Sequence, residues 1–333
     1  MEIQKNWYSK KIDVIIKPKK GEIKDWNASI LTYKNNEILI LLDQIEKKKD
    51  NIIFDAEIEI IVQFNFNNIN QDLFWLLLLI YGLKTYRPKS VRLTLPYFPY
   101  THKDIFNEEF TKSIKINTDH SLLTILQNSW IDYINTYDLG NKYIKTYYDI
   151  FVEEVSKKDI FTEEFDFFRR TKKRVTIIVL NKEDYNYFKK YVGNKENINI
   201  IFIDWDIKKK TKAEKISILS SVKNPDNTLI YIFDKMLIRW AKIYNLIDFL
   251  MANLDIKELN LCITHGIFAF WSYIKFNSLM EKYKYLNIVT TDSIYSPYVE
   301  KLNKKQTEIY PLWIKEKILS ELKNNTDNDE IKE

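Results

Sequence analysis

Short apolar runs alternate with one long apolar segment in the first 140 residues, and this alternation predicts strands and helices in turn. Four runs have the length and the side chains of strands: Val14–Ile16, Glu37–Leu42, Ile58–Phe64 and Val91–Leu95. Between the last two, Gln71–Lys84 carries leucine at most turns of a helical period, which predicts a buried helix ending near Gly82. The sequence of strand, helix and strand is the repeating unit of a parallel sheet.

The rest of the chain repeats this alternation. A helix at Ser113–Gln127 and a strand at Ile131–Tyr137 are followed by residues 153–172, which have no clean period. A second series then follows: strand Val175–Leu180, helix Lys182–Tyr191, strands Ile198–Ile203 and Thr228–Phe233, helix Ile238–Leu254, strand Glu258–Thr264, helix Ala269–Tyr283 and strand Leu286–Thr291. Pro311–Lys323 is expected to form a final amphipathic helix.

These patterns predict an α/β fold with two tandem domains, each a mainly parallel sheet flanked by helices. We expect an N-terminal domain at residues 1–152, a connecting segment at 153–172, a C-terminal domain with the final helix at 173–323, and a disordered tail at 324–333. In such sheets ligands bind at the carboxyl ends of the strands, so the loops there are the ones to inspect.

Composition narrows the class of protein. The 333 residues include 45% hydrophobic and 29% charged side chains, typical of globular proteins. The net charge of +5 comes from lysines scattered among acids, which makes nucleic acid an unlikely partner. The only cysteine, Cys262, suits a reducing compartment, and the longest apolar run, Leu73–Leu83, is too short for a membrane span. A cytoplasmic location is expected.

Three stretches carry a specific resemblance. They are Leu-Pro-Tyr-Phe-Pro-Tyr at 95–100 with Asp104 after it, Thr-His-Gly-Ile-Phe at 264–268, and Val-Thr-Thr-Asp-Ser-Ile at 289–294. Together they resemble the ribose-phosphate pyrophosphokinase family, across roughly residues 55–319. The resemblance implies two phosphoribosyltransferase-like domains. It also implies transfer of pyrophosphate from ATP to ribose 5-phosphate, with Mg²⁺, to give phosphoribosyl pyrophosphate (PRPP) and AMP.

The resemblance assigns candidate ATP-binding residues in the first half of the chain. Asp55 and Glu57 match two acids of a family segment that contacts adenine, although Ala56 replaces its glycine. His102, Lys103 and Asp104 follow the Tyr-Phe-Pro-Tyr stretch, where the family has arginine, glutamine and aspartate. Lys103 can meet a phosphate as a point charge but cannot form the bidentate arginine fork. Packing of the aromatic residues and solvation of His102 and Lys103 is an equally good interpretation.

Other positions have lost the residues that the family uses. Asp138 is the candidate metal ligand, but Gly140 stands where the family has a histidine, and Asp138 also suits a turn. Asn181-Lys182-Glu183-Asp184 replaces an acid and two glycines. Lys208 and Lys209, which the resemblance places near the transferred group, are also typical of a solvated turn.

The ribose-phosphate turn is the most altered stretch. Asp234 matches its first acid, but Arg239-Trp240-Ala241-Lys242 replaces the glycine-rich turn that would hold the 5-phosphate. Asp234 and Arg239 are therefore the remaining candidates for binding ribose 5-phosphate. We expect Asp234–Lys242 to be helical, with Trp240 filling the phosphate space.

These changes leave three hypotheses open. The chain is a pyrophosphokinase with weak or no catalysis, which would need ATP and Mg²⁺. Alternatively, it is a non-catalytic regulatory subunit that associates with itself or with an active homologue. A third hypothesis is a repurposed protein that binds an unrelated ligand or partner through new aromatic residues such as Trp240 and Trp271.

Overall fold

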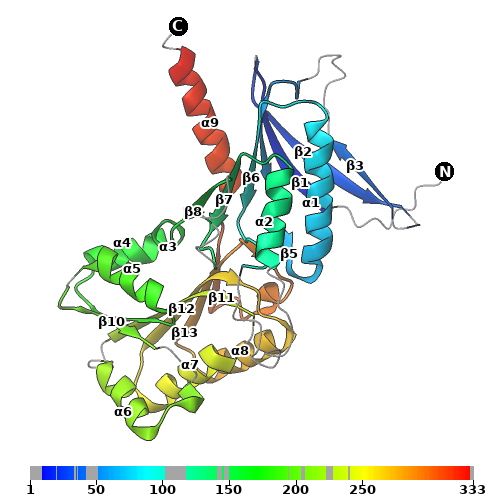
Figure 1. Ribbon diagram of the computed structural model, residues 1–333. Helices are drawn as coiled ribbons and strands as arrows, with labels where there is room; N and C mark the ends of the chain where they lie inside the picture. The colour runs from blue at the N-terminus through cyan, green and yellow to red at the C-terminus, as the bar shows by residue number, and fades with distance from the viewer. Residues whose placement is uncertain are drawn as a thin grey trace. The chain divides into compact units, whose positions relative to one another are not determined.

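The computed structural model describes residues 10–19, 21–33, 35, 37–42, 52–101, 118–140, 145, 150–193, 195–203, 207–222, 228–238 and 241–330. Contacts divide the chain into two compact units (Figure 1). Unit 1 comprises residues 1–155 and 313–333, and unit 2 comprises residues 156–312. No helix in the described part of the chain is long and apolar enough to cross a membrane.

Unit 1 is built on a seven-stranded sheet in the order β3-β2-β1-β4-β6-β7-β8. β1 (Lys10–Lys17), β2 (Lys24–Thr32) and β3 (Ile38–Leu42) form an antiparallel meander, and β1 pairs antiparallel with β4 (Glu57–Ile61). β4, β6 (Ser90–Leu95), β7 (Tyr133–Tyr137) and β8 (Phe151–Val155) are parallel to one another. The short elements β5 (Phe64–Asn65) and η1 (Phe66–Asn68) precede α1.

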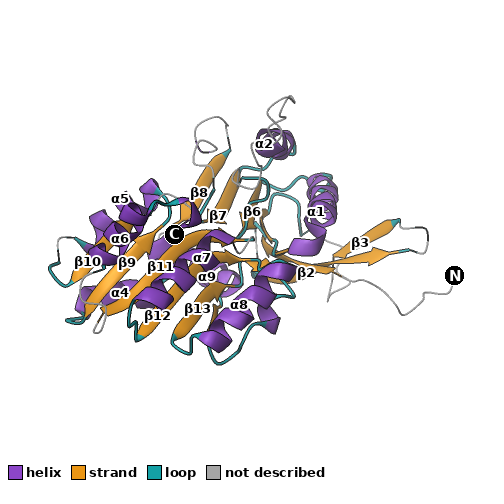
Figure 2. Ribbon diagram, turned by 90° about the horizontal axis from the view of Figure 1, so that it is seen from below, coloured by secondary structure: helices purple, strands orange, loops and turns teal. Residues whose placement is uncertain are grey.

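The two faces of this sheet differ in chemistry because side chains alternate along each strand. One face carries apolar residues such as Val14, Ile60 and Leu93, all buried. On this side α1 (Ile69–Lys84) and α2 (Thr118–Asn128) lie side by side (Figures 1 and 2). The opposite side chains include many polar ones, and there Lys315 of α9 (Ile314–Glu330) donates to Asp13 at 2.9 Å.

Unit 2 is built on a six-stranded, wholly parallel sheet in the order β10-β9-β11-β12-β13-β15. Its strands are β9 (Arg174–Val179), β10 (Ile198–Phe202), β11 (Thr228–Leu237), β12 (Glu258–Gly266), β13 (Leu286–Thr291) and β15 (Thr307–Tyr310), with the short β14 (Ile294–Tyr295). Its helices are α3 (Lys157–Ile160), α4 (Thr162–Arg170), α5 (Lys182–Val192), η5 (Ile207–Lys209), α6 (Lys212–Ser221), α7 (Ala241–Asn253), α8 (Phe270–Lys282) and η7 (Val299–Lys301).

The sequence of β11 explains why unit 2 buries both faces of its sheet. Ile230 and Ile232 belong to an aliphatic core with residues of α7 and α8. Tyr231 and Phe233 point the other way, into an aromatic cluster with residues of α4 and α5. A run of apolar residues without polar alternation is what a strand covered on both faces requires.

Several sequence predictions differ from this fold. The predicted domain limits placed the final helix with the second domain, whereas α9 groups with unit 1, where Lys315 bonds to Asp13 and, at 2.7 Å, to Asp25. α9 also continues to Glu330, through part of the tail predicted to be disordered. The elements β2, β8, α3, α4, α6, β14 and β15 had no counterpart in the predictions, whereas α1 ends at Lys84, the last residue of the predicted helix.

Candidate active site

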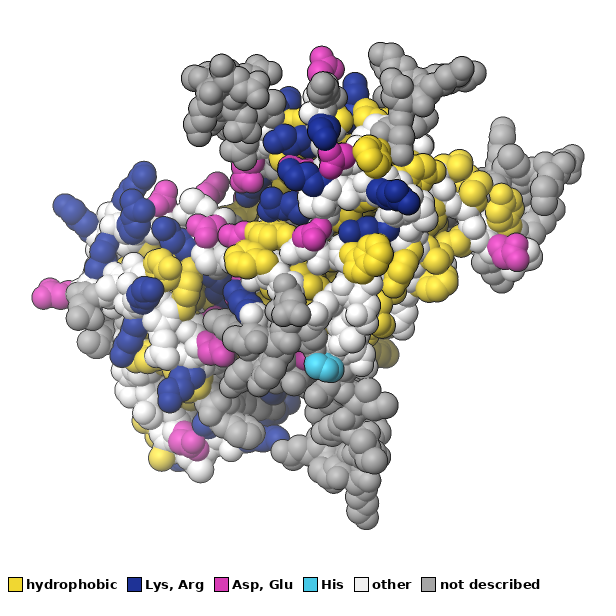
Figure 3. All heavy atoms as spheres, turned by 45° about the horizontal axis from the view of Figure 1, so that its top comes forward, with side chains coloured by type: hydrophobic (Ala, Val, Ile, Leu, Met, Phe, Trp, Pro, Cys, Tyr) yellow, Lys and Arg dark blue, Asp and Glu magenta, His cyan; other side chains and the backbone are white. Residues whose placement is uncertain are grey.

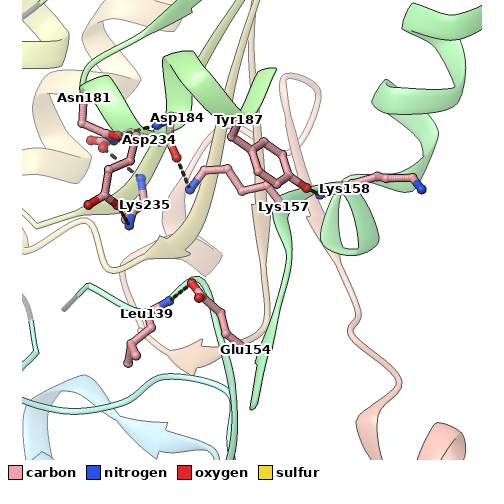
Figure 4. A network of polar contacts seen from close by, with 10 residues as sticks. Leu139, Glu154, Lys157, Lys158, Asn181, Asp184, Tyr187, Asp234 and Lys235 are labelled. Carbon is pink, nitrogen blue, oxygen red and sulfur yellow. Dashed lines mark hydrogen bonds and ion pairs between the residues drawn. The ribbon is translucent and has the colours of Figure 1, made fainter. Parts of the chain in front are cut away.

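The carboxyl edge of the parallel strands in unit 1 holds Asp138, immediately after β7. Its side chain is buried and its backbone has φ 45°, a conformation that aspartate tolerates better than most residues. The Asp138 amide donates to the Val155 carbonyl at 3.4 Å, and the next amide, Leu139, donates to Glu154 Oε1 at 2.8 Å (Figure 4). The turn is therefore held by β8, which agrees with the interpretation of Asp138 as a turn residue.

The loop after β6 is packed by its aromatic residues. Such packing is one of the two interpretations that the sequence left open for this loop. Tyr97 and Phe98 are buried, and burial raises the pKa of Tyr97 to about 12. Tyr100 is partly exposed, and its hydroxyl donates to Asn70 at the start of α1. The candidate ATP-binding residues His102, Lys103 and Asp104 lie outside the described residues.

Asp55 and Glu57 lie at the other end of the same sheet. Asp55 precedes β4 and Glu57 begins it, whereas Asp138 follows β7, which runs parallel to β4. Asp55 pairs with Lys19 at 2.6 Å and Glu57 with Lys89 at 2.7 Å. The hydrogen bonds from these lysines lower the pKa of both carboxyls. About 15 Å of strand separates them from the carboxyl edge, so they and Asp138 do not form one site within unit 1.

In unit 2 the acid-bearing stretch that leads into the predicted ribose-phosphate turn is extended, not helical. β11 continues from Thr228 to Leu237, and Asp234 and Met236 pair with Ile263 and His265 of β12. The prediction of a helix over Asp234–Lys242 is therefore wrong for its first four residues; α7 begins only at Ala241. Arg239 and Trp240 lie outside the described residues.

The end of β11 is fixed by its neighbours. The Leu237 carbonyl accepts hydrogen bonds from the Ile267 and Phe268 amides at 3.2 and 2.9 Å, and the Ile238 carbonyl accepts one from Ser272 at 2.6 Å. These bonds tie the strand to the Thr-His-Gly-Ile-Phe stretch at 264–268. The local sequence predicted a helix here, but continued pairing with β12 keeps the segment extended.

Gly266 within that stretch has a packing role. A Cβ at this position would lie 2.2 Å from Thr290 Oγ1. His265 beside it is buried and shares a hydrogen bond of 2.8 Å with Ser293, whose hydroxyl also donates to the Thr264 carbonyl at 3.0 Å. The motif thus joins β12 to β13 by close approach and by buried hydrogen bonds.

The turn after β9 is closed by a helix cap. Asn181 accepts a hydrogen bond from the Asp184 amide at 2.8 Å and donates to the Asp184 carboxylate at 2.7 Å (Figure 4). Asp184 in turn pairs with Lys157 at 3.4 Å, and both side chains are buried. Asn181 is a favoured N-cap residue, so α5 starts where the resemblance would place two glycines. Lys157 was not predicted, because nothing in its local sequence marks a buried lysine.

Asp234 and its neighbour lie beside this cap. The Asp234 carboxylate accepts a hydrogen bond from the Lys235 amide at 2.8 Å (Figure 4). The Lys235 side chain pairs with Glu183 of α5 at 3.7 Å. Lys208 and Lys209 are exposed in η5, whose turn packs against α7. Among the described residues, no three acid, histidine or cysteine side chains are grouped closely enough to hold a metal ion.

Comparison with known proteins gives this architecture a family context. A curated ribose-phosphate pyrophosphokinase from Fusobacterium nucleatum is 22% identical over 279 residues, which span 83% of this chain and 81% of that protein. The chain resembles the ribose-phosphate pyrophosphokinases. The crystal structure of phosphoribosylpyrophosphate synthetase from Mycobacterium smegmatis matches this pyrophosphokinase-like chain with a TM-score of 0.64 and 14% identity, over 90% of each chain. No protein-family model matches the sequence.

These matches confirm two predictions for the pyrophosphokinase-like chain. The α/β fold with two tandem phosphoribosyltransferase-like domains is correct, and so is the resemblance seen in the three motifs. Similarity at this level fixes the fold and leaves the chemistry to the individual loops.

Proposed function

We propose that this chain is a ribose-phosphate pyrophosphokinase-like protein with little or no PRPP synthesis, which acts as a non-catalytic subunit of an oligomer. The observation that carries the proposal is β11, which stays extended through Leu237. A phosphate turn needs several consecutive amides that point at one anion. Here Asp234–Leu237, the acid-bearing stretch before that turn, is paired along β12 and does not provide such a set of donors, and the turn position at 239–242 has no glycine.

The turn after β9 supports the same proposal. With Asn181 in place of the family's acid, the Asp184 amide, one of the free amides in the first turn of α5, is occupied by the helix's own cap. The buried Lys157–Asp184 ion pair also places two charged side chains at this end of the helix. A pyrophosphate group would have to displace both interactions before it could bind.

Phosphoryl transfer depends on cations and donors that neutralise charge in the transition state. The chain has His102 and Lys103 where the family has an arginine and a glutamine, and Gly140 where it has the metal-associated histidine. Removing one preorganised donor commonly lowers a rate by about 10²–10³. Several such losses together bring the expected rate close to the uncatalysed one.

ATP with Mg²⁺ is still the ligand pair to test for binding. Asp55, Glu57 and Asp138 are the described candidates, and Lys103 is the candidate for a phosphate contact. The described residues supply no ready-made group of metal ligands. Any bound magnesium would therefore depend on the oxygens of the nucleotide.

The decisive experiment is an assay for AMP and PRPP with ATP, Mg²⁺ and ribose 5-phosphate, with the Fusobacterium nucleatum relative as positive control. We expect a rate at least a thousandfold below the control. Asp234→Asn and Asp138→Asn variants identify the source of any residual turnover, because activity that they leave unchanged comes from a contaminant. A rate within tenfold of the control, lost in both variants, would refute the proposal.

A second experiment addresses the role as a subunit. The chain is mixed with an active pyrophosphokinase from the same organism, and the mass of the mixture and its rate of PRPP formation are measured. Co-elution with a changed rate is the expected result. Separate elution with an unchanged rate would rule out a regulatory partnership with that enzyme.

A further inference from the structure

The amino edge of the unit 2 sheet, where its parallel strands begin, is strongly basic. The described stretches that lead into these strands or begin them are residues 169–174, 195–197, 255–258, 283–285 and 303–306. They hold ten lysines or arginines and three acids, a net charge of +7 (ten minus three), whereas the whole chain carries +5. All other residues together therefore carry a net charge of −2 (five minus seven).

Hydrogen bonds hold the first two of these stretches together. Lys195 Nζ donates to the Phe168 carbonyl at 3.1 Å. The Asn197 amide group donates to the carbonyls of Thr171 and Lys173 at 3.0 and 2.8 Å. The loop before β10 is therefore fixed beside the loop before β9, and their cations share one surface.

The basic edge continues across the other strands. Lys257 directly precedes β12, and Lys284 lies two residues before β13, which pairs with β12. Lys304 and Lys305 precede β15, which pairs with β13. Neighbouring strands are about 4.8 Å apart, so these lysines follow one another along the edge.

The exposed cations of this edge are not balanced by nearby acids. Among the residues that the structure describes, the following exposed side chains form no ion pair: Lys172, Lys173, Arg174, Lys257, Lys284 and Lys304. The helix dipole explains Arg169 and Arg170, which end α4 and pair with Asp166 at 3.4 and 3.8 Å. It does not explain the six unpaired cations, because they lie outside helices. Their mutual repulsion is relieved when an anionic ligand binds.

Arginine is concentrated at this edge. The chain has six arginines among its 51 basic residues, and three of the six lie within residues 169–174. Elsewhere the chain uses lysine for its positive charge, so a general bias in composition does not account for this stretch. The planar guanidinium group binds phosphate with two parallel N–H bonds, which lysine cannot do. Phosphate is therefore the anion that this edge fits best.

Exposed tyrosine rings accompany the cations. Tyr285 is 62% exposed and follows Lys284. Tyr191 ends the outer face of α5, and the ammonium groups of Lys158 and Lys190 lie 5.8 and 5.7 Å from its ring. Figure 3 shows lysine and arginine side chains gathered on the side of the molecule where α4 and α5 lie in Figure 1. Aromatic faces among phosphate-binding cations are what proteins use to hold a single strand, because any base can stack on them.

We propose that the amino edge of the unit 2 sheet binds single-stranded nucleic acid, with its cations on the phosphates and with Tyr285 and Tyr191 against the bases. Six strands give an edge about 24 Å long, which spans about seven nucleotides at about 3.4 Å each. An anionic membrane is a poorer fit. Surfaces that bind membranes insert tryptophan, phenylalanine or leucine, and the five stretches contain none of these.

This proposal revises an expectation and is independent of the proposed function. The sequence argued against nucleic acid because its lysines are scattered along the chain, whereas folding gathers them at one edge. Catalysis, if present, would occur at the opposite end of the strands, where Asp234 lies. Failure of one proposal therefore leaves the other intact.

The test measures fluorescence anisotropy of labelled oligouridine and oligothymidine of about ten nucleotides with the full-length chain. We expect a dissociation constant of about 10⁻⁶–10⁻⁴ M at physiological salt. Lys172→Ala/Lys173→Ala/Arg174→Ala should weaken binding at least tenfold and lower the slope of log K against log salt by about 2. Tighter binding of one oligonucleotide identifies RNA or DNA as the source of the ligand.

The matched control is Lys182→Ala/Lys212→Ala/Lys317→Ala, which removes the same charge from exposed positions away from this edge. It should bind like the wild type, and both triple variants should keep the wild-type thermal unfolding midpoint because only exposed side chains change. No binding up to about 100 µM at physiological salt, or equal weakening in both triple variants, would overturn the proposal.

A final variant separates a single strand from any other polyanion. Tyr285→Ala should weaken binding of the oligonucleotides at least fivefold, because a stacking surface for a base is lost. It should leave the binding of inorganic polyphosphate of equal length unchanged. Unchanged affinity of Tyr285→Ala for the oligonucleotides would contradict the proposal. So would binding to vesicles of phosphatidylserine and phosphatidylcholine without binding to either oligonucleotide.

Discussion

Replacing Gly266 with alanine tests whether the end of β12 is held by close approach. The new Cβ would lie 2.2 Å from Thr290 Oγ1, 3.0 Å from Thr290 Cβ and 3.2 Å from a ring carbon of Phe268. Contacts this short force either the strand or Thr290 to move. Overpacking of a buried site typically costs 1–3 kcal/mol, and because one contact is far inside the van der Waals limit we expect about 3 kcal/mol. Urea unfolding measures this free energy directly.

A double variant identifies the cause of that loss. Thr290 Oγ1 is buried and has no hydrogen-bond partner among the described residues, so Thr290→Ala should itself cost little. In Gly266→Ala/Thr290→Ala the worst contact is absent, and we expect at least 1 kcal/mol to be recovered relative to additive behaviour. Gly82→Ala is the matched control, expected to gain up to about 1 kcal/mol. If Gly266→Ala unfolds at the same urea concentration as the wild type, the close-approach argument is wrong.

Three other perturbations test polar groups in unit 2. Burial raises the pKa of Glu164, which accepts a hydrogen bond from Tyr310 at 2.7 Å. Its contribution to stability is therefore present below the ordinary glutamate pKa and is lost as pH rises through the raised value. In the wild type, the free energy of unfolding should fall by up to about 1.4 kcal/mol per pH unit in that window, and Glu164→Gln should remove this fall. Urea unfolding at pH 5 and pH 8 measures it, and an equal change in wild type and variant between the two pH values would contradict the prediction. Asn181→Ala should lower the free energy of unfolding by about 1 kcal/mol, because it removes the cap of α5. Thermal unfolding measures this loss, and an unchanged stability would show that the cap contributes nothing. Lys157→Met should lower the free energy of unfolding by about 3 kcal/mol, because it leaves the buried Asp184 carboxylate without its cation. The double variant Lys157→Met/Asp184→Leu should regain most of that stability. A double variant as unstable as Lys157→Met would contradict the role of the ion pair.

Hydrophobic pattern was sufficient for most of the parallel strands. Val175–Leu180 and Thr228–Phe233 are continuous apolar runs, and such runs are needed where both faces of a sheet are covered. The ends of the strands were harder to predict. Met236 and Leu237 were expected in a helix, and only their pairing with His265 and Gly266 explains why they are extended. That pairing joins segments about thirty residues apart, beyond the reach of local propensity.

The candidate site shows the same division between local and distant information. The motif at 264–268 identified the family resemblance, because its residues are fixed by short-range needs such as the space beside Gly266. The role of Asn181 as a cap is also local and could have been inferred from Asp184 three residues later. Lys157 could not, because it meets Asp184 only when α3 and α5 pack together.

Because α9 belongs to unit 1 while the whole of unit 2 precedes it, the chain begins and ends in the same unit. On the ribosome, residues 156–312 emerge as one continuous stretch and can fold as a block before unit 1 is complete. All seven strands of the unit 1 sheet lie within residues 1–155, but the last helix of this unit docks only when Lys315 reaches Asp13 and Asp25. Synthesis would therefore finish the second unit first, the reverse of the usual N-terminal-first order. A chain that stops before Trp313 should be released with its first unit unfinished and prone to degradation.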